Sequence, residues 1–292
     1  MYGRIGPAEY RLTPGQIRDF RDRGCCTLED VLTEEEVSSI EEIFDRFVSG
    51  EIPVPGKDFC DMSKSFGVPY GEWSIVNCML PTRYHPPFRD NIYEKLTSNI
   101  AGQLFRPELE MTKDYDQFLN KRPGKTDAVF AWHQDMGYWP SSKVLGVDDG
   151  LTTTATFSLA IDDSDLANGC LRYVPGSHKA RTLRPHVPLI RKERTTTTDE
   201  EEPLPGREEG HALTIGVDES SEPVRYATAR RGSVTVHDEY VVHGSGGNTL
   251  PDRQRRTYVL AYRPAAVVAA ERAIGFTHSH NDDVNWDTFQ RE

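Results

Sequence analysis

A histidine and an aspartate stand two residues apart in the segment FAWHQDMGYWP, at positions His133 and Asp135. If this segment is a β-strand, residues i and i+2 project from the same face, so the imidazole and the carboxylate can converge on one metal ion. The pattern alone is weak support, because nine histidines and 46 acidic residues in 292 give about 1.4 His-x-Asp/Glu triplets by chance. The sequence has three such triplets, the others starting at His237 and His280, so the metal interpretation needs a third ligand.

His243 is the candidate for that third ligand. It lies in the segment VVHGSGGN, where an apolar predicted strand meets a glycine-rich turn. Two histidines and one carboxylate on one face of an iron ion leave its other face open, which is the ligand arrangement of non-haem Fe(II) oxygenases. We therefore predict that His133, Asp135 and His243 bind the metal and form the catalytic centre. His237 and Glu239 precede His243 on the same predicted strand, and we expect them to be structural or to support the ligands.

A basic side chain would complete such a centre if the co-substrate is 2-oxoglutarate, whose distal carboxylate needs a cation. Arginine suits this task because its planar guanidinium can hold a carboxylate through two parallel hydrogen bonds. Arg255 lies twelve residues after His243, at the start of the predicted strand RRTYVLAY. Arg253 and Arg256 are nearby competitors, but alternation along a strand lets only one of Arg255 and Arg256 point into the interior. We predict that Arg255 is the anchor.

The elements that must position these residues change type along the chain. Thr13 and Thr33 are typical helix caps, and apolar residues recur at helical spacing after Thr33, up to about residue 50. We predict an irregular loop over residues 51–88, which is rich in glycine and proline, and a further helix over residues 88–104. After that, short runs of β-branched and aromatic residues separated by turn signals predict an antiparallel sandwich or barrel. The polar segment 191–210 is predicted to be an exposed or mobile loop.

Composition and charge limit the classes of function. A hydrophobic content of 37% is sufficient for a core, and a formal net charge of −12 argues against a nucleic-acid partner, which usually selects a basic surface. No run approaches the roughly 18 apolar residues of a membrane helix, so no membrane partner is expected. The five cysteines include no CxxC pair, which favours reduced thiols in a cytoplasmic protein. The composition predicts no oligomeric state.

Several segments, in this order along the chain, resemble the phytanoyl-CoA dioxygenase family of Fe(II)/2-oxoglutarate-dependent oxygenases. They are the helical N-terminus, WHQDMGYWP, the run LAIDDSDLANGCLRYVPGSHK, the run RGSVTVHDEYVVHGSGGN and the arginine strand that follows. The resemblance implies a mainly β fold, a cupin-like double-stranded β-helix or jelly roll, with an α-helical N-terminal layer. We expect one domain over residues 1–292, with the helical layer over about 1–105 and the jelly-roll core over about 106–265. His133, Asp135 and His243 would be the iron ligands.

The same resemblance implies a reaction and further site residues. Fe(II), 2-oxoglutarate and O2 would act together to hydroxylate, or otherwise oxidise, an unactivated C–H bond of a small organic molecule, with release of succinate and CO2. Gln117 and Ser245 stand where family members contact the co-substrate, beside Arg255. The match departs from the family in two places: the family's arginine follows the distal histidine one residue sooner than Arg255 does, and Ser158 stands where many relatives carry tryptophan. We expect the substrate to belong to specialised metabolism.

The walls of the substrate pocket and the class of activity leave alternatives open. Tyr138 and Trp139 directly follow the metal motif and are candidates for the pocket wall, although core packing would also explain them. Trp73 is a further candidate, in a loop that could act as a lid. His278 and His280 lie in the polar segment THSHNDD and are expected to be solvated. A metal-binding cupin-like isomerase, a binding protein or a catalytically silent family member are the alternative functions, and iron-dependent succinate formation separates them from an oxygenase.

Overall fold

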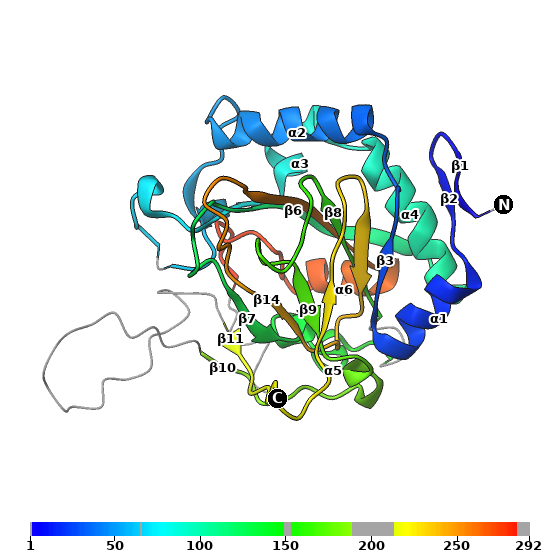
Figure 1. Cartoon of the computed structure of the whole chain (residues 1–292). Helices are drawn as coiled ribbons and strands as arrows, with labels where there is room; N and C mark the ends of the chain where they lie inside the picture. The colour runs from blue at the N-terminus through cyan, green and yellow to red at the C-terminus, as the bar shows by residue number, and fades with distance from the viewer. Residues whose placement is uncertain (1, 65, 149–152, 189–212, 285–292) are drawn as a thin grey trace, which may run out of the picture.

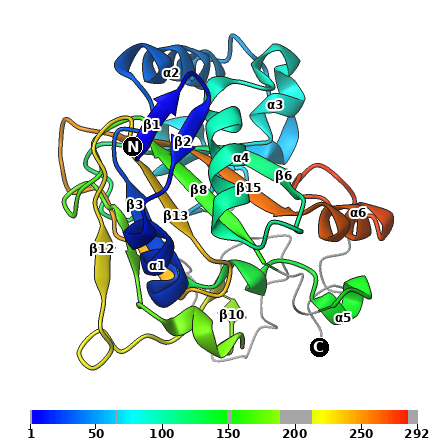
Figure 2. The same ribbon diagram turned by 90° about the vertical axis from the view of Figure 1, so that its right-hand side faces the viewer.

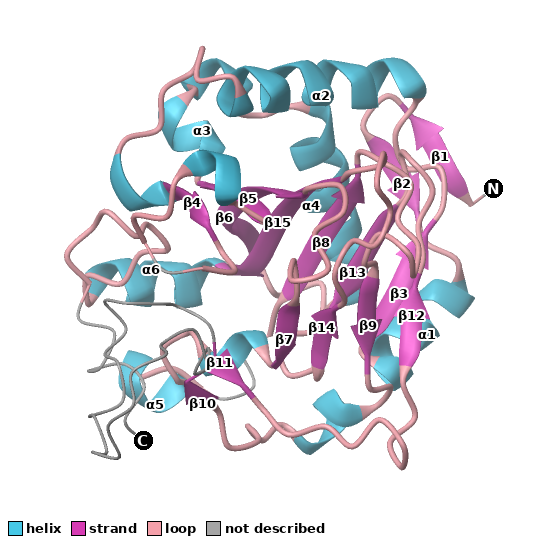
Figure 3. Ribbon diagram, turned by 60° about the vertical axis from the view of Figure 1, so that its left-hand side comes forward, coloured by secondary structure: helices cyan, strands magenta, loops and turns pink. Residues whose placement is uncertain are grey.

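Two antiparallel sheets form the body of the molecule. The computed structural model describes residues 2–64, 66–148, 153–188 and 213–284, so the polar segment 191–210 lies outside the described residues. The larger sheet has, in spatial order, β3 (Cys25–Leu28), β13 (Val234–His237), β8 (Ala155–Ala160), β15 (Arg255–Pro264), β6 (Met111–Lys121), β5 (Ile75–Met79) and β4 (Phe59–Asp61). The smaller sheet has β12 (Arg225–Ala227), β9 (Leu171–Tyr173), β14 (His243–Ser245) and β7 (Phe130–His133), and Figure 3 shows it lying across from the larger one.

Helices and small strand pairs surround these sheets. The helices are α1 (Pro14–Arg23), α2 (Glu34–Val48), α3 (Pro81–Tyr84), α4 (Ile92–Leu104), α5 (Ser142–Leu145) and α6 (Ala265–Ala273). Two further antiparallel pairs join β1 (Gly3–Gly6) to β2 (Glu9–Arg11) and β10 (Val187–Pro188) to β11 (Leu213–Thr214). Figure 1 shows α2 and α4 covering one side of the large sheet, and Figure 2 shows α6 beside the ends of β15 and β6. None of the helices in the described ranges combines the length and the apolar run that a bilayer crossing requires.

Two helices begin as the sequence predicts. The side chains of Thr13 and Thr33 each accept a hydrogen bond from the backbone N–H three residues later. In turn, the side-chain oxygens of Gln16 and Glu36 accept a hydrogen bond from the backbone N–H of the cap residue. Each capping box satisfies two of the backbone N–H groups that a helix leaves unpaired at its start. These caps fix where α1 and α2 begin.

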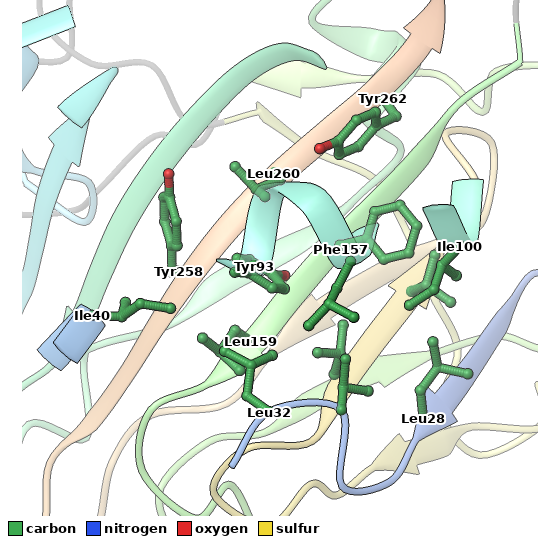
Figure 4. Packing of buried hydrophobic residues seen from close by; sticks show 14 of the residues in the cluster. Leu28, Leu32, Ile40, Tyr93, Ile100, Phe157, Leu159, Tyr258, Leu260 and Tyr262 are labelled. Atoms are coloured by element: carbon green, nitrogen blue, oxygen red, sulfur yellow. The ribbon is translucent and has the colours of Figure 1, made fainter. Parts of the chain in front are cut away.

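The main core lies between the helices and the large sheet. Phe157, Leu159, Tyr258 and Leu260 project from β8 and β15 toward α4 and α2, as Figure 4 shows. Phe118 of β6 belongs to the same core and is fully buried. Truncating such an aromatic residue to alanine typically costs about 3–5 kcal/mol of stability. Because strand side chains alternate, the residues between these apolar positions point the other way, toward the small sheet.

The predicted mainly β fold with an outer helical layer is confirmed, and the arrangement is that of a jelly roll. The prediction for the N-terminal part was incomplete. The first fifty residues contain β1, β2 and β3 as well as helices, and the segment predicted as an irregular loop contains β4, β5 and α3. The strands β3 and β5 are short and lack alternation because both of their faces are covered, and β5 is buried along its whole length. Pairing with β6 and β13 from distant parts of the chain decides their structure.

Candidate metal centre

The three predicted metal ligands lie together between the two sheets. His133 ends β7, Asp135 begins a 3₁₀ turn (Asp135–Gly137), and His243 begins β14. The pairing of β14 with β7 places His243 directly opposite His133. The Nε2 atoms of His133 and His243 lie 3.6 Å and 3.4 Å from Oδ1 of Asp135. One ligand atom from each residue falls within 4.8 Å of the others, so the three side chains can reach a single ion.

Backbone carbonyls set the orientation of both imidazoles. Nδ1 of His133 lies 2.7 Å from the carbonyl oxygen of Ala131, and Nδ1 of His243 lies 2.9 Å from that of Val241. A carbonyl only accepts, so each Nδ1 carries the hydrogen and each Nε2 presents its lone pair to the centre. This second contact is the usual way in which a protein fixes the tautomer of a metal-binding histidine.

The carboxylate of Asp135 is held by two neighbours that do not belong to the three. Its Oδ2 lies 3.2 Å from Nε2 of His237 and accepts a hydrogen bond of 3.1 Å from the hydroxyl of Thr156. Burial raises the pKa of Asp135, but the imidazoles of His243, His133 and His237 outweigh it and hold that pKa well below its usual value. An ionised carboxylate with imidazole lone pairs is the form that binds a cation, and the donor set fits Fe(II).

Two buried cations face each other on the neighbouring strands. Lys121 of β6 and Arg255 of β15 are direct partners across the antiparallel ladder, with only 1% and 9% of their surfaces exposed. Lys121 donates from Nζ to the hydroxyl of Ser245 and to the carbonyl of Gly246, while Nε of Arg255 donates to the hydroxyl of Ser164 at 2.9 Å. Within the described residues, neither cation has a carboxylate partner.

This pairing of like charges makes the spot complementary to an anion. Burial lowers the pKa of Lys121 well below its usual value, and the charge of Arg255 adds to the effect. Burial also lowers the pKa of Arg255 to about 10. Like charges directly opposite in a ladder destabilise the sheet, and a buried charge without a partner is costly. Ser245, which Lys121 contacts, lies two residues after His243, so the cationic pair adjoins the candidate metal ligands.

The competing arginines point elsewhere. Arg256 faces the helical layer, where it pairs with Asp162, Glu41 and Asp45. Arg253 is exposed in the preceding turn and pairs with Asp165 at 3.0 Å. The contacts of Arg256 follow from alternation, because Arg255 takes the face of β15 that is turned toward the small sheet, whereas Arg253 lies before the strand begins.

A cavity of about 170 Å³ opens beside the candidate ligands. Its wall includes His133, Asp135, two methionines, several aromatic side chains and two further histidines, with Tyr138, Trp139 and Gln117 among the lining residues. Gln117 donates its amide to Oδ1 of Asn77 at 2.6 Å. The structure does not place Trp73 in this wall. Its ring packs against Phe59 and Tyr70, and its Nε1 donates to the carbonyl of Val68 at 2.8 Å.

The expectation that His278 and His280 are solvated was wrong. His278 is buried, with 6% of its surface exposed, and both histidines line the cavity. The segment THSHNDD is polar because it contacts buried polar groups, and Asp114 and Asp58 bind it from distant parts of the chain. Sequence reasoning also missed Lys121, whose position next to the polar turn RPGK gave no sign of burial. Only the antiparallel pairing of Lys121 with Arg255 indicates its role, and that pairing is known only once the fold is known.

Known proteins with similar sequences are dioxygenases. The family model described as Phytanoyl-CoA dioxygenase (PhyH) matches residues 20–257. A protein of Stutzerimonas stutzeri named "Probable alpha-ketoglutarate-dependent hypophosphite dioxygenase" is 27% identical over 256 residues, which cover 86% of this chain and 78% of the relative. An ectoine dioxygenase of Bordetella parapertussis is 23% identical over 249 residues, covering 82% of this chain and 72% of the relative.

Solved structures share the fold at low identity. EvdO2 from Micromonospora carbonacea var. aurantiaca, complexed with 2-oxoglutarate, superposes with a TM-score of 0.62 at 24% identity, covering 87% of this chain and 91% of that one. EctD from S. alaskensis with bound Fe gives a TM-score of 0.59 at 17% identity, covering 90% and 83%. Because the family match spans most of the sequence, the chain belongs to the phytanoyl-CoA dioxygenase family and is an Fe(II)/2-oxoglutarate-dependent oxygenase.

Proposed function

We propose that His133, Asp135 and His243 hold the Fe(II) ion and that the enzyme oxidises an unactivated C–H bond of a small organic molecule, most simply by hydroxylation. The convergence of the three side chains, with both imidazole lone pairs and Oδ1 of Asp135 aimed at one point, supports this assignment. When bound, the iron supplies O2 activation coupled to the oxidative decarboxylation of 2-oxoglutarate to succinate and CO2. The protein's own residues position the reactants and exclude water.

The observation that carries the co-substrate site is the buried pair of Lys121 and Arg255. Two basic side chains without a carboxylate partner in the described part of the chain can both carry their charge at low cost when an anion neutralises them. The distal carboxylate of 2-oxoglutarate supplies that anion, and the guanidinium of Arg255 suits a two-point contact with it. Ser245 connects the two sites, because its hydroxyl binds Lys121 and it lies two residues after His243. Gln117 would contact the other end of the co-substrate from the cavity wall.

Neighbouring residues keep the proposed ligands in place and dry. His237 and Thr156 hold Oδ2 of Asp135, which leaves Oδ1 directed at the two ligand histidines. Tyr138 and Trp139 stand in the cavity wall next to this group, where their rings restrict the access of water. Water exclusion strengthens each electrostatic contact inside the site.

The cavity wall favours an organic substrate. Hypophosphite, the substrate in the name of one relative, is a small inorganic anion, and no lysine or arginine stands among the described residues that line the cavity. Aromatic and methionine side chains suit a ring-containing molecule instead. Several structures with this fold come from specialised-metabolite pathways, such as the carbocyclase SnoK from nogalamycin biosynthesis, with a TM-score of 0.58 at 22% identity. We propose a substrate of that kind.

The protein is proposed to act in the cytoplasm, with no partner required other than its small-molecule substrate. All five cysteines are buried and free, which fits a reducing compartment. Fe(II) also persists best where reductants are present.

Succinate release tests the proposed function. Purified protein with Fe(II) and 2-oxoglutarate should form succinate when a fractionated metabolite extract is added, with an oxidised product of matching yield. His133→Ala should abolish both signals, while His85→Ala, which alters a histidine outside the candidate site, should leave them unchanged. Conversion of a metabolite without succinate would instead support a cupin-like isomerase.

A further inference from the structure

The segment that follows α6 closes one side of the cavity. Figure 2 shows it turning back beside α6 toward β6. Phe276 and Ser279 are fully buried within it, and His278 and His280 reach the cavity wall. The segment shares that wall with Met62 and Met79, which come from the N-terminal half of the chain.

Buried polar contacts hold this segment in one position. Asp58, which has no exposed surface, accepts hydrogen bonds from the hydroxyl of Tyr84 at 2.6 Å, the hydroxyl of Ser279 at 2.7 Å and the backbone of His280 at 2.6 Å. Further along, Arg83 binds both carboxylate oxygens of Asp282, at 2.9 Å and 3.0 Å. One buried carboxylate thus accepts three hydrogen bonds from two distant parts of the chain, and these bonds fix the segment against the rest of the protein.

A glycine allows the close approach of this segment. Asn281 accepts a 2.7 Å hydrogen bond from the backbone of Lys57 and donates to the carbonyl of Pro55 at 2.8 Å. Gly56, between these two residues, has a φ of +66°, and a Cβ there would lie 2.2 Å from Oδ1 of Asn281. Only glycine fits, so the sequence at residues 55–57 is adapted to hold the C-terminal segment.

The ring of His278 is oriented by an ionised carboxylate. Its Nε2 lies 2.8 Å from Oδ2 of Asp114. Burial raises the pKa of Asp114, but the hydrogen bond from His278 and the charges of Arg263 and Arg272 outweigh that effect and lower the pKa. A carboxylate in this state only accepts, so Nε2 of His278 carries the hydrogen and donates. Nδ1 has no hydrogen-bond partner among the described residues.

Aromatic neighbours fix the plane of the same ring. His278 packs against Tyr115 with ring centroids 4.3 Å apart, and its edge meets Trp139 at 6.1 Å. Tyr115 and Trp139 line the cavity with His278, so the three rings form one continuous part of the wall. Because Nε2 of the neutral imidazole donates to Asp114, Nδ1 is the ring nitrogen of His278 that can accept a further hydrogen bond.

We propose that His278 determines substrate specificity by accepting, at Nδ1, a hydrogen bond from a hydroxyl or N–H group of a ring-containing substrate. This inference rests on the proposed function and names the class of substrate, a cyclic alcohol, phenol or amine. The substrate's ring packs against Tyr115 and Trp139, and its polar hydrogen points to His278. One fixed acceptor and one ring plane together select which C–H bond faces the proposed iron ligands.

A matched pair of probes tests the hydrogen bond. Benzyl alcohol and benzyl methyl ether have similar rings, but only the alcohol can donate. Their dissociation constants are measured by NMR titration of protein loaded with Fe(II) and 2-oxoglutarate without oxygen. We expect the wild type to bind the alcohol about fivefold more tightly, the effect of one net hydrogen bond. His278→Phe keeps a flat ring and should bind both probes equally.

Two variants control for structure. Asp282→Asn removes the contact with Arg83 on the outer side of the same segment and should keep the wild-type preference. His278→Gln retains an acceptor and should keep part of the preference. The proposal is overturned if the wild type does not distinguish the probes, if neither probe binds, or if His278→Phe still prefers the alcohol. Failure of every protein to bind 2-oxoglutarate would instead refute the proposed function.

Discussion

The strands β6 and β15 carry buried charges at both ends of their pairing, and the two ends differ in how these charges are neutralised. At one end Arg263 and Arg272 contact the carboxylates of Asp114 and Glu271. At the other end Lys121 faces Arg255 with no carboxylate among the described residues. The first cluster balances its charges with the protein's own carboxylates. For the second, we propose that a bound anion supplies the opposite charge.

The comparison also distinguishes two groups that could be taken for metal sites. Ligand atoms of Asp114, Glu271 and His278 lie within 4.8 Å of one another, as do those of the proposed iron ligands. In the first group two guanidinium groups already occupy the carboxylates, and His278 donates to one of them. Proximity of histidines and carboxylates is therefore insufficient, and what matters is whether the protein supplies its own cations.

The largest expected effect is on metal binding. His243→Ala removes a proposed ligand and should weaken Fe(II) binding by more than about 100-fold, abolishing turnover. His237→Ala removes a residue that contacts Oδ2 of Asp135 and the ring of His243 but is not a proposed ligand, and should cost about 10–100-fold at most. Anaerobic titration with Fe(II) measures both values. Equal losses in the two variants would mean that the roles of ligand and support have been assigned wrongly.

The end of the β6 and β15 pairing that holds Asp114 and Arg263 should respond to mutation through stability and not through the affinity for 2-oxoglutarate. Asp114→Asn removes a buried carboxylate that contacts the fully buried Arg263 and the partly exposed Arg272, and breaking a buried ion pair typically costs about 3–5 kcal/mol of the free energy of unfolding. Denaturant unfolding measures this loss, and calorimetry should find the affinity for 2-oxoglutarate unchanged. A weakened affinity for 2-oxoglutarate without a loss of stability would show that the two ends do not differ in the way described.

At the other end of the pairing, where Lys121 faces Arg255, removal of a charge should change the stability in the opposite direction. Lys121→Met removes one of two facing buried cations, so the free energy of unfolding without co-substrate should rise by about 1–3 kcal/mol. The same change should weaken 2-oxoglutarate binding by about tenfold or more, because a charged partner of the carboxylate is lost. Thermal unfolding with and without 2-oxoglutarate measures both effects. A variant that is destabilised in both conditions would show that Lys121 is structural.

Particular residues show how far sequence reasoning reaches. The spacing of His133 and Asp135 and strand alternation at Arg255 predicted these positions, because both rules are local. Lys121 and His278 were beyond its reach, because their burial depends on partners more than a hundred residues away, Arg255 and Asp114. The same holds for β3, whose pairing partner β13 lies in the second half of the chain. Trp73 had suitable chemistry but packs elsewhere, because residue type does not fix direction.

A smaller effect concerns pH. Burial and Arg255 lower the pKa of Lys121 in the free protein, whereas a bound carboxylate raises it again. Binding of 2-oxoglutarate should therefore take up protons once the pH exceeds the lowered pKa, and affinity should fall as pH rises. The fall is at most about tenfold per pH unit for one linked proton. Calorimetry in buffers of different ionisation enthalpy should detect the uptake in the wild type and not in Lys121→Met.

A titration with 2-oxoglutarate shows whether Lys121 and Arg255, beside the proposed iron ligands, anchor the co-substrate. Fe(II)-loaded wild type, Arg255→Met and Arg256→Met are titrated with 2-oxoglutarate without oxygen. Loss of a buried charged partner of a carboxylate typically costs about 2–5 kcal/mol, so Arg255→Met should bind at least about thirtyfold more weakly. Arg256→Met, whose guanidinium binds Asp162 on the other face, should bind nearly as well as the wild type. Weak binding by Arg256→Met together with normal binding by Arg255→Met would show that Arg255 does not hold the distal carboxylate.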